Sequence, residues 1–355
     1  MAKGTIKLAD VAKAAGVSQG TASNVFNRPE VVREEVREHV LATAKRLGYA
    51  GPSLTGRLLR AGKVNAIGVA AVEPIAYFFN DPWARALLAA VSRVCDASGT
   101  GLALVSAKDR QTVDWNIKSA LVDGFILLCV EGGEKLVQLT RERQLPFIAL
   151  ALNDEDPSIP SISVDNVGGA AVAARHLAEL GHRRFGVLAT ELSDDNVGPV
   201  GIAEIERGIY STSRNRALGY WQALEAFGIG REDVPIYETL NDKPSVEAGL
   251  NYLFSLPEPP TAILAMSDNI ALLAINWLRA RGLSVPQDVS VIGFDGVPEG
   301  GMVEPGLTTM AQPFAEIAER AVQAVLHDAV PAEREMIGVT LIVRGSTAAP
   351  RPDRI

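Results

Sequence analysis

Hydrophobic positions follow two different patterns along this chain of 355 residues. In the first 50 residues they recur at helical spacing in three short stretches. From about residue 65 onward, short runs that are apolar throughout alternate with helical patterns. Such runs are typical of buried parallel strands. The sequence therefore predicts a small all-helical part followed by a much longer α/β part.

The helical part begins with two short helices set close together. Their inner faces are formed by Leu8, Val11, Ala12 and Ala15 in the first and by Ala22, Val25 and Phe26 in the second. Gly16 suits the left-handed conformation that ends a helix, and Ser18 suits the cap that begins the next one. A third helix, from about residue 33 to 47, packs through Val36, Val40 and Leu47. This is the pattern of a helix-turn-helix unit.

The α/β part contains two series of strands and helices. The strands of the first series are NAIGVAAV, GLALVSA, GFILLCV and PFIALAL, with helices near 82–98, 112–121 and 133–143. The second series begins with SISV and continues with RRFGVLA, VPIYETL, TAILAM and VSVIGF, with helices near 167–180, 214–228, 245–256 and 268–281. The alternation predicts two doubly wound parallel-sheet lobes. Ligands of such sheets bind beyond the carboxyl ends of the strands, so we expect a cleft between the lobes.

The distribution of charge separates the two parts further. Residues 1–62 contain ten basic and five acidic side chains, whereas the remainder contains 24 basic and 37 acidic ones. The net charge of the whole chain is −8 and would argue against nucleic-acid binding. A basic head on an acidic body instead indicates that the head alone contacts a polyanion.

Polar residues gather at the start of the second helix, the end that enters the major groove of DNA in this motif. The candidate DNA-binding residues there are Ser18, Gln19, Gly20, Thr21, Ser23, Asn24 and Asn27. Glutamine and asparagine can make two hydrogen bonds to an adenine edge, while serine and threonine suit phosphates or several bases. The alternative is a helical subdomain that contacts only protein. The glycine turn, the serine cap and the local positive charge together favour DNA binding.

The stretches DVAKAAGVSQGTASNVFN and VREEVREHVLATAKRLGY resemble the headpiece of the lactose/galactose repressor (LacI/GalR) family. The likeness continues through VDNVGGAAVAARHLAELGHRRFGVL, AMSDNIAL and VSVIGFDGVP. It implies a homodimeric transcription regulator, most commonly a repressor, that binds a palindromic double-stranded operator. A small effector, a sugar or related metabolite, would control it from the cleft. The resemblance leaves open whether the effector induces or corepresses, and whether the dimers pair into tetramers.

The resemblance also assigns roles within the head and the segment that follows it. Gln19, Gly20 and Asn24 would read bases, whereas Thr21, Ser23 and Asn27 would hold the DNA backbone. Residues 51–63 would be a hinge that becomes helical on the operator, with Leu59 as the wedge in the minor groove. Gly56 disfavours that helix by about 1 kcal/mol. The alternative is an ordinary interdomain linker with incidental leucines.

The resemblance implies the domain organisation as well. Residues 1–50 would be the headpiece, and residues 64–355 a two-lobed effector-binding and dimerisation domain with the periplasmic-binding-protein-like fold. The first lobe would hold residues of about 64–164 and 294–325, and the second about 165–293 and 326–345. The chain would thus return to the first lobe after residue 294, and the last strand, VTLIV, would lie in the second.

Two residues of the α/β part match the family's ligand-binding positions, namely Arg216 and Asp295. A guanidinium can grip hydroxyls or a carboxylate with two donors, and an arginine with an aspartate suits a polyhydroxylated ligand. The weaker candidates for the effector site are Ser267, Asp268, Phe314, Phe79 and Asp81. By themselves Arg216 and Asp295 could equally be a solvated helix residue and a turn former. Ala151 stands where sugar-binding relatives often carry an aspartate.

Patterns for catalysis, metal binding and cofactor binding are missing from the sequence. It has no GxGxxG after a strand, no GxxxxGK[ST] and no GxSxG, and neither its two cysteines nor its four histidines have metal-ligand spacing. We therefore expect no enzyme activity, cofactor or metal. No secretory segment or run long enough to span a bilayer is present, so the cytoplasm, with the nucleoid, is the expected compartment. The rival classes are a cytoplasmic sugar-binding protein and a sugar-metabolising enzyme fused to a helix-turn-helix.

Overall fold

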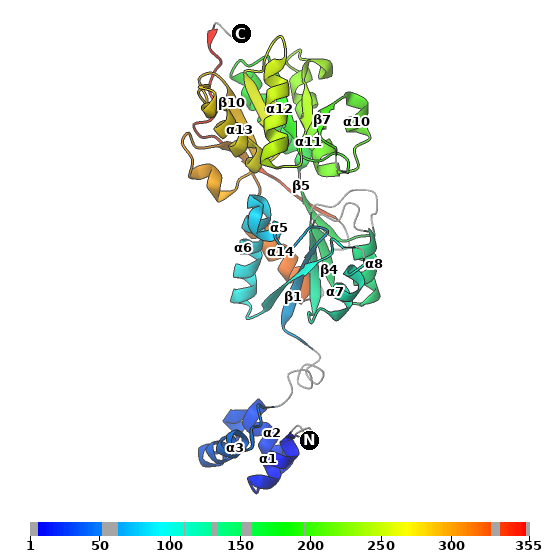
Figure 1. The fold of residues 1–355 in the computed structure, drawn as a ribbon, viewed down its shortest axis with the longest axis vertical. Coiled ribbons are helices and arrows are strands. Elements are labelled where there is room, and N and C mark those ends of the chain that lie inside the picture. The colour runs from blue at the N-terminus through cyan, green and yellow to red at the C-terminus, as the bar shows by residue number, and fades with distance from the viewer. Residues whose placement is uncertain are drawn as a thin grey trace. The chain divides into compact units, whose positions relative to one another are not determined.

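The chain divides into two compact units, Met1–Val64 and Asn65–Ile355. The computed structural model describes residues 6–51, 63–109, 111–128, 134–150, 158–194, 196–327 and 334–352. Figure 1 labels the elements of both units. No helix among the described residues is long and apolar enough to cross a membrane.

In its described residues, the first unit consists of three helices around one small core. They are α1 (Leu8–Ala14), α2 (Gln19–Asn27) and α3 (Glu34–Leu47), with a 3-10 turn, η1 (Pro29–Val31), before the last. The buried core consists of Val11, Ala12, Ala15, Ala22, Val25, Val40 and Ala44. Gly16 has a φ of 66°, which lets the chain turn sharply between α1 and α2. The predicted helix-turn-helix is confirmed.

A six-stranded parallel sheet forms the first lobe of the second unit. Its order is β12-β5-β4-β3-β1-β2. The strands are β1 (Ala66–Ala71), β2 (Gly101–Ser106), β3 (Gly124–Leu128), β4 (Phe147–Leu150), β5 (Ser161–Val164) and β12 (Glu335–Ile337). The helices that belong to this lobe are α5 (Tyr77–Asn80), α6 (Pro82–Ala97), α7 (Val113–Ser119), α8 (Glu134–Glu142) and α14 (Phe314–Leu326).

A seven-stranded sheet, in the order β13-β11-β10-β9-β6-β8-β7, forms the second lobe. The strands are β6 (Phe185–Ala189), β7 (Gly198–Val200), β8 (Ile236–Glu238), β9 (Ala262–Ala265), β10 (Ser290–Asp295), β11 (Thr308–Ala311) and β13 (Thr340–Ile342). The helices are α9 (Asn166–Glu179), α10 (Ile202–Glu206), α11 (Ser211–Glu225), α12 (Lys243–Ser255) and α13 (Asp268–Ala280), with 3-10 turns η2 (Arg231–Asp233) and η3 (Pro298–Gly301). Among the described strands, only the edge strands β7 and β13 pair antiparallel to their neighbours.

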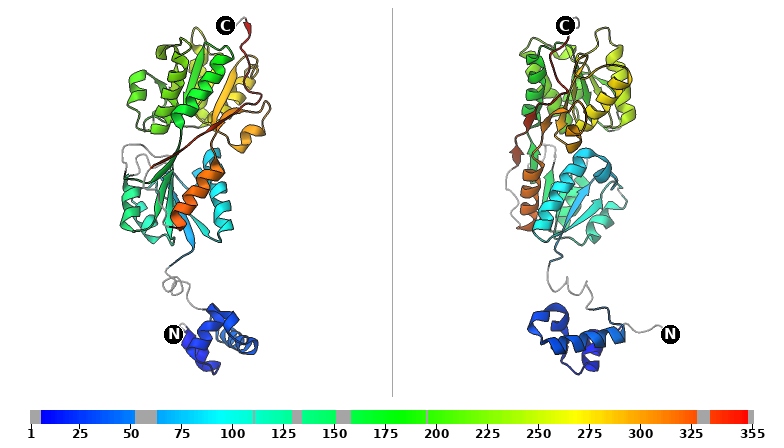
Figure 2. Two further views of the ribbon diagram at one scale, coloured as in Figure 1. Left: turned by 180° about the vertical axis from the view of Figure 1, so that it is seen from behind. Right: turned by 90° about the vertical axis from the view of Figure 1, so that its left-hand side faces the viewer.

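Both sheets are covered by helices on both faces. In β3 the neighbouring side chains of Phe125 and Ile126 belong to different hydrophobic clusters, and in β6 the same holds for Val187 and Leu188. Neighbouring residues of a strand point to opposite faces, so each lobe has a packed core on either side of its sheet. This is the predicted pair of doubly wound lobes, and Figure 2 shows them from two further sides.

The path of the chain between the lobes differs from the predicted one. The SISV strand, β5, opens the second series along the chain but pairs with β4 in the first sheet, within the expected bounds of the first lobe, about 64–164. The segment expected to return to the first lobe after residue 294 instead forms β11, which pairs with β10 in the second sheet. The chain returns only with α14. Residues of about 326–345 were expected in the second lobe. Of the two strands in this segment, β12 pairs with β5 in the first sheet, and β13 lies in the second sheet as expected. Apolar runs specify strands but not the sheet they join.

Candidate functional site

The start of α2 presents a row of polar side chains on the first unit. Ser18 caps the helix, because its hydroxyl accepts a hydrogen bond of 3.0 Å from the Thr21 amide. The two hydroxyls also bond each other at 2.8 Å. One turn further along, the Asn27 side-chain amide donates to the Ser23 hydroxyl at 3.1 Å. These four side chains therefore use part of their hydrogen-bonding capacity within the helix.

Gln19, Gly20 and Asn24 differ from their neighbours on α2. All three are exposed, and the side chains of Gln19 and Asn24 have no hydrogen-bond partner within the described part of the first unit. Gly20 adds no side chain to this exposed part of α2. Residue Leu59 lies outside the described residues, as does most of the predicted hinge.

A cleft of about 570 Å³ lies between the two lobes of the second unit. Its walls include residues that follow β1, β6, β8, β9 and β11 at their carboxyl ends, which is where a ligand of parallel sheets binds. The polar and charged lining residues are Glu73, Asn80, Asp81, Ser163, Asn166, Thr190, Glu191, Thr212, Ser213, Arg216, Asn241, Ser267, Asn269, Asp295 and Gln312. The aromatic ones are Tyr77, Trp83 and Tyr210.

Arg216 lies on α11 and is only 5% exposed. Its Nε donates to Asn166 Oδ1 at 2.9 Å, and its Nη1 donates to the Met266 carbonyl. Its Nη2 lies 3.8 Å from Asp295 Oδ1, and its guanidinium stacks over the Phe294 ring at 3.7 Å from the centroid. Burial lowers the pKa of Arg216, but an arginine remains charged at every physiological pH. The side chain is therefore a fixed cation in the floor of the cleft.

Asp295 ends β10 in a strained backbone conformation, with a φ of 140°. Such a conformation costs about 1–3 kcal/mol in a residue other than glycine and is concentrated at functional sites. The Asp268 amide and the Gln312 side chain both donate to this carboxylate, at 3.3 Å and 2.9 Å. Burial raises the pKa of Asp295 well above its usual value, and the charge of Arg216 offsets that only in part.

Two amides connect the walls of the cleft. Gln312 donates to Asp295 in the second lobe and accepts a hydrogen bond of 3.1 Å from the Trp83 indole in the first. Asn241 donates to Asp81 in the first lobe at 3.0 Å and accepts from Ser267 at 2.7 Å. The first turn of α6 thus contacts the second lobe through both amides, and the Arg85–Glu299 ion pair adds a third link.

Four of the seven predicted effector residues line this cleft, namely Arg216, Asp295, Ser267 and Asp81. Asn241 and Gln312 were missed, although each follows a strand at its carboxyl end, a signal that the sequence contains.

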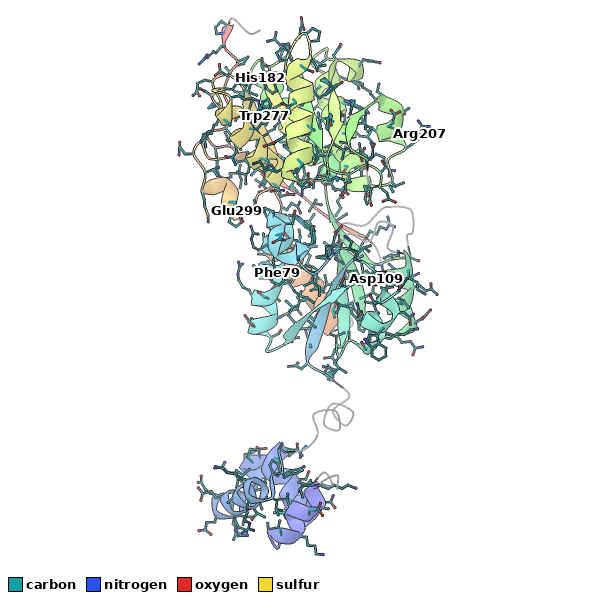
Figure 3. The ribbon with its side chains drawn as sticks, in the orientation of Figure 1. Phe79, Asp109, His182, Arg207, Trp277 and Glu299 are labelled. Carbon is teal, nitrogen blue, oxygen red and sulfur yellow. The ribbon has the colours of Figure 1, made fainter. Side chains whose placement is uncertain are left out.

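The other three predicted effector residues lie outside the cleft wall. The Asp268 carboxylate is fully buried and accepts from the Thr309 hydroxyl and the Gly296 amide. Phe314 packs against the core of the first lobe. Phe79, labelled in Figure 3, is 57% exposed on the outside of α5. The sequence does not reveal which way a side chain at the end of an element points. A role of these three residues in effector binding stays a prediction, although none of them is among the residues that line the cleft.

Both units match known protein families. Residues 7–51 match the family model of bacterial regulatory proteins, lacI family, and residues 174–347 match that of the periplasmic binding protein-like domain. The HTH-type transcriptional regulator Rv3575c of Mycobacterium tuberculosis is 36% identical over 352 residues, which cover 97% of each chain. The HTH-type transcriptional repressor PurR of Actinobacillus pleuropneumoniae is 30% identical and covers 91% of this chain and 90% of its own.

A solved structure has the same fold. It is the lac repressor dimer bound to operator and the anti-inducer ONPF, with a TM-score of 0.75, 24% identity and coverage of 97% of this chain and 99% of that one. The relatives named above are transcriptional regulators and not enzymes.

Proposed function

The chain belongs to the lacI family of bacterial regulatory proteins, and from this premise we propose that it is a repressor that binds a palindromic operator as a homodimer under the control of a small metabolite. That it is a DNA-binding transcriptional regulator follows from the family. The operator, the dimer and the metabolite are the proposal, together with a place of action on the nucleoid in the cytoplasm.

The DNA-binding proposal is supported chiefly by the two free amides of α2. Gln19 and Asn24 read bases, and each can form a bidentate pair with an adenine edge. Ser18, Thr21, Ser23 and Asn27 contact the DNA backbone, because hydroxyls and amides already engaged on one side still reach phosphates. Gly20 brings the helix close to the bases, and Leu59 kinks the operator centre.

The effector proposal is supported by the polar lining of the cleft. Arg216 and Asp295 fix the orientation of a polyhydroxylated, sugar-like ligand, and Ser267 and Asp81 line its two sides. The ligand changes the relative stability of open and closed lobes, and that preference sets the size of its effect on DNA binding. Because the Gln312 and Asn241 bridges join both walls, a ligand that replaces or strengthens them alters lobe closure.

A selection from random-sequence duplexes tests the DNA-binding proposal. The full-length protein should enrich a two-fold symmetric sequence, since a symmetric dimer reads two equal half-sites. A Gln19→Ala/Asn24→Ala variant serves as the matched control and should enrich no defined sequence while retaining weak general binding. Enrichment of a single asymmetric site, or of the same motif by the variant, would exclude the proposal.

A further inference from the structure

Acidic side chains dominate the charged part of the cleft wall. Among the described residues its lining contains four carboxylates, Glu73, Asp81, Glu191 and Asp295, but only one cation, Arg216. Glu73 follows β1 in the first lobe and Glu191 follows β6 in the second, so the two lie at the carboxyl ends of different sheets. A bound ligand therefore meets carboxylates on both sides.

The single cation among the described lining residues already interacts with other groups of the protein. Arg216 donates to Asn166 and to the Met266 carbonyl, and its remaining terminal nitrogen faces Asp295. An anionic ligand would have to displace or share Asp295 to pair with this guanidinium. A hydroxyl group, in contrast, can accept from it and donate to a carboxylate at the same time.

Burial makes negative charge unfavourable in this site. Burial raises the pKa values of Glu73, Asp81 and Asp295. For Glu73 the charge of Lys108 opposes this shift, yet desolvation outweighs it. Lys108 itself is exposed and is not part of the lining. A further negative charge brought in by a ligand would face the same desolvation together with repulsion.

We propose, on the basis of the function proposed above, that the effector is a polyhydroxylated molecule without an anionic group and that Glu73 and Glu191 determine this selectivity. Both carboxylates accept hydrogen bonds from hydroxyl or ammonium groups of the ligand, and both repel phosphate esters and sugar acids. The site accordingly takes free polyols, sugars or amino sugars and excludes their phosphorylated forms.

Quenching of tryptophan fluorescence by charged quenchers tests the sign of the electrostatic potential in the cleft, and it does not require that the ligand be known. Trp83 lines the cleft, Trp221 and Trp277 are buried, and Trp115 is 73% exposed elsewhere. In full-length Trp115→Phe protein, caesium and acrylamide should quench the accessible indole, whereas iodide should quench it far less. Glu73→Gln/Glu191→Gln in the same background should raise iodide quenching severalfold. Equal quenching of the parent by iodide and caesium would overturn the proposal.

A panel of matched ligands tests the selectivity itself. Full-length protein is heated with D-glucose, D-glucosamine and D-glucose 6-phosphate, and with the corresponding forms of other sugars and polyols. A ligand that binds the folded protein raises the melting temperature, and at equal concentration the tighter ligand raises it more. Within the series that stabilises the protein, the phosphate should bind at least about tenfold more weakly than the neutral or amino form, a difference of about 1.4 kcal/mol. The Glu73→Gln/Glu191→Gln variant should narrow that gap.

Two outcomes separate this inference from the proposed function. A phosphate ester that stabilises the protein best and releases the operator would overturn the charge selectivity while leaving metabolite control intact. A neutral polyol that binds in the cleft without any change in operator affinity would support the selectivity and contradict the control of DNA binding.

Discussion

At the scale of single residues, the side chains of α2 differ in whether the protein already uses their polar atoms. Ser18, Thr21, Ser23 and Asn27 bond one another along the helix, whereas Asn24 does not. A side chain with both its donor and its acceptor free can distinguish one base from another. Asn27, whose amide already donates to Ser23, is suited to a contact with the DNA backbone, which positions the helix without reading a base.

Asn24→Ala should therefore weaken binding to the selected operator by about 1–3 kcal/mol, or tenfold or more, with little change on a scrambled duplex. Asn27→Ala is the matched control and should weaken both duplexes about equally. Fluorescence anisotropy at a fixed salt concentration measures the two affinities, since the electrostatic part depends strongly on salt. An equal loss on both duplexes for Asn24→Ala would remove this residue from base reading.

Arg216→Ala should abolish the response of operator binding to the effector while leaving operator binding itself in place. The arginine belongs to the cleft of the second unit, whereas α2 belongs to the first. Removal of the guanidinium also leaves Asn166 and Met266 without their donors, so the second unit should lose about 1–3 kcal/mol of stability.

Anisotropy titrations with and without effector measure the response of this variant, and calorimetry verifies that it remains folded. Thr212→Ala, a change in the same cleft that leaves the Arg216 contacts intact, is the control for general damage to the lining. A folded Arg216→Ala protein with the full effector response would move the ligand elsewhere.

At the scale of elements, the second lobe depends on the close approach of α9 and α11. Gly219 allows it, because a Cβ added there would lie 2.3 Å from the Val167 carbonyl oxygen and 2.8 Å from the Ala170 Cβ. Both neighbours belong to α9, one of them as backbone, so neither can move aside alone. α9 carries Asn166 and α11 carries Arg216, and this helix contact therefore also sets the Asn166–Arg216 hydrogen bond.

Gly219→Ala should destabilise the second unit by about 1–3 kcal/mol through overpacking. Gly338→Ala is the control, since a Cβ added at that position meets no atom within 4 Å. Urea unfolding of both variants gives the comparison. If Gly219→Ala were as stable as the parent, the helix contact would be looser than the structure has it.

Hydrogen bonds of a buried histidine hold the segment after β13 against the second sheet. His182, labelled in Figure 3, contacts the Thr261 hydroxyl through Nδ1 at 2.9 Å and the Ala348 carbonyl through Nε2 at 2.9 Å. A carbonyl only accepts, so Nε2 carries the proton and donates. Burial lowers the pKa of His182. Burial also lowers the pKa of His176, whose ring forms a hydrogen bond with the Thr347 hydroxyl.

Stability should therefore fall as the pH drops below about 6.5, the usual pKa of histidine. In that range the unfolded chain binds protons that the folded chain does not, which favours unfolding. His182→Gln should make the pH dependence shallower between neutral and mildly acid conditions. Urea midpoints measured across this range provide the comparison, and an unchanged slope in the variant would show that His182 does not cause the loss.

Strand and helix positions followed from the sequence because buried parallel strands are apolar throughout and the helices have apolar faces. The assignment of β11 and β12 to lobes did not follow, because four- and three-residue strands carry no information about the sheet they join. Of the residues that line the cleft, Arg216 and Asp295 were named from the family pattern. Asn241 and Gln312 were not named: their position after a strand could be seen in the sequence, but their hydrogen bonds to the opposite lobe could not.

At the scale of the whole molecule, the proposed function assigns DNA recognition to the basic head and ligand binding to the acidic body. The opposite net charges of the two parts favour contact of DNA with the head rather than with the body. Regulation requires that the two be thermodynamically coupled. A ligand that favours one arrangement of the lobes must then bind with different affinity to free and operator-bound protein.

The most direct measurement is the affinity of full-length protein for its effector with and without saturating operator. The account predicts a change by a factor of about 5–150, equal to the factor by which the effector changes operator affinity. Calorimetric titration gives the first factor and anisotropy the second. If the protein bound both effector and operator, but its affinity for the effector were the same with and without operator, control of DNA binding by the effector would be contradicted.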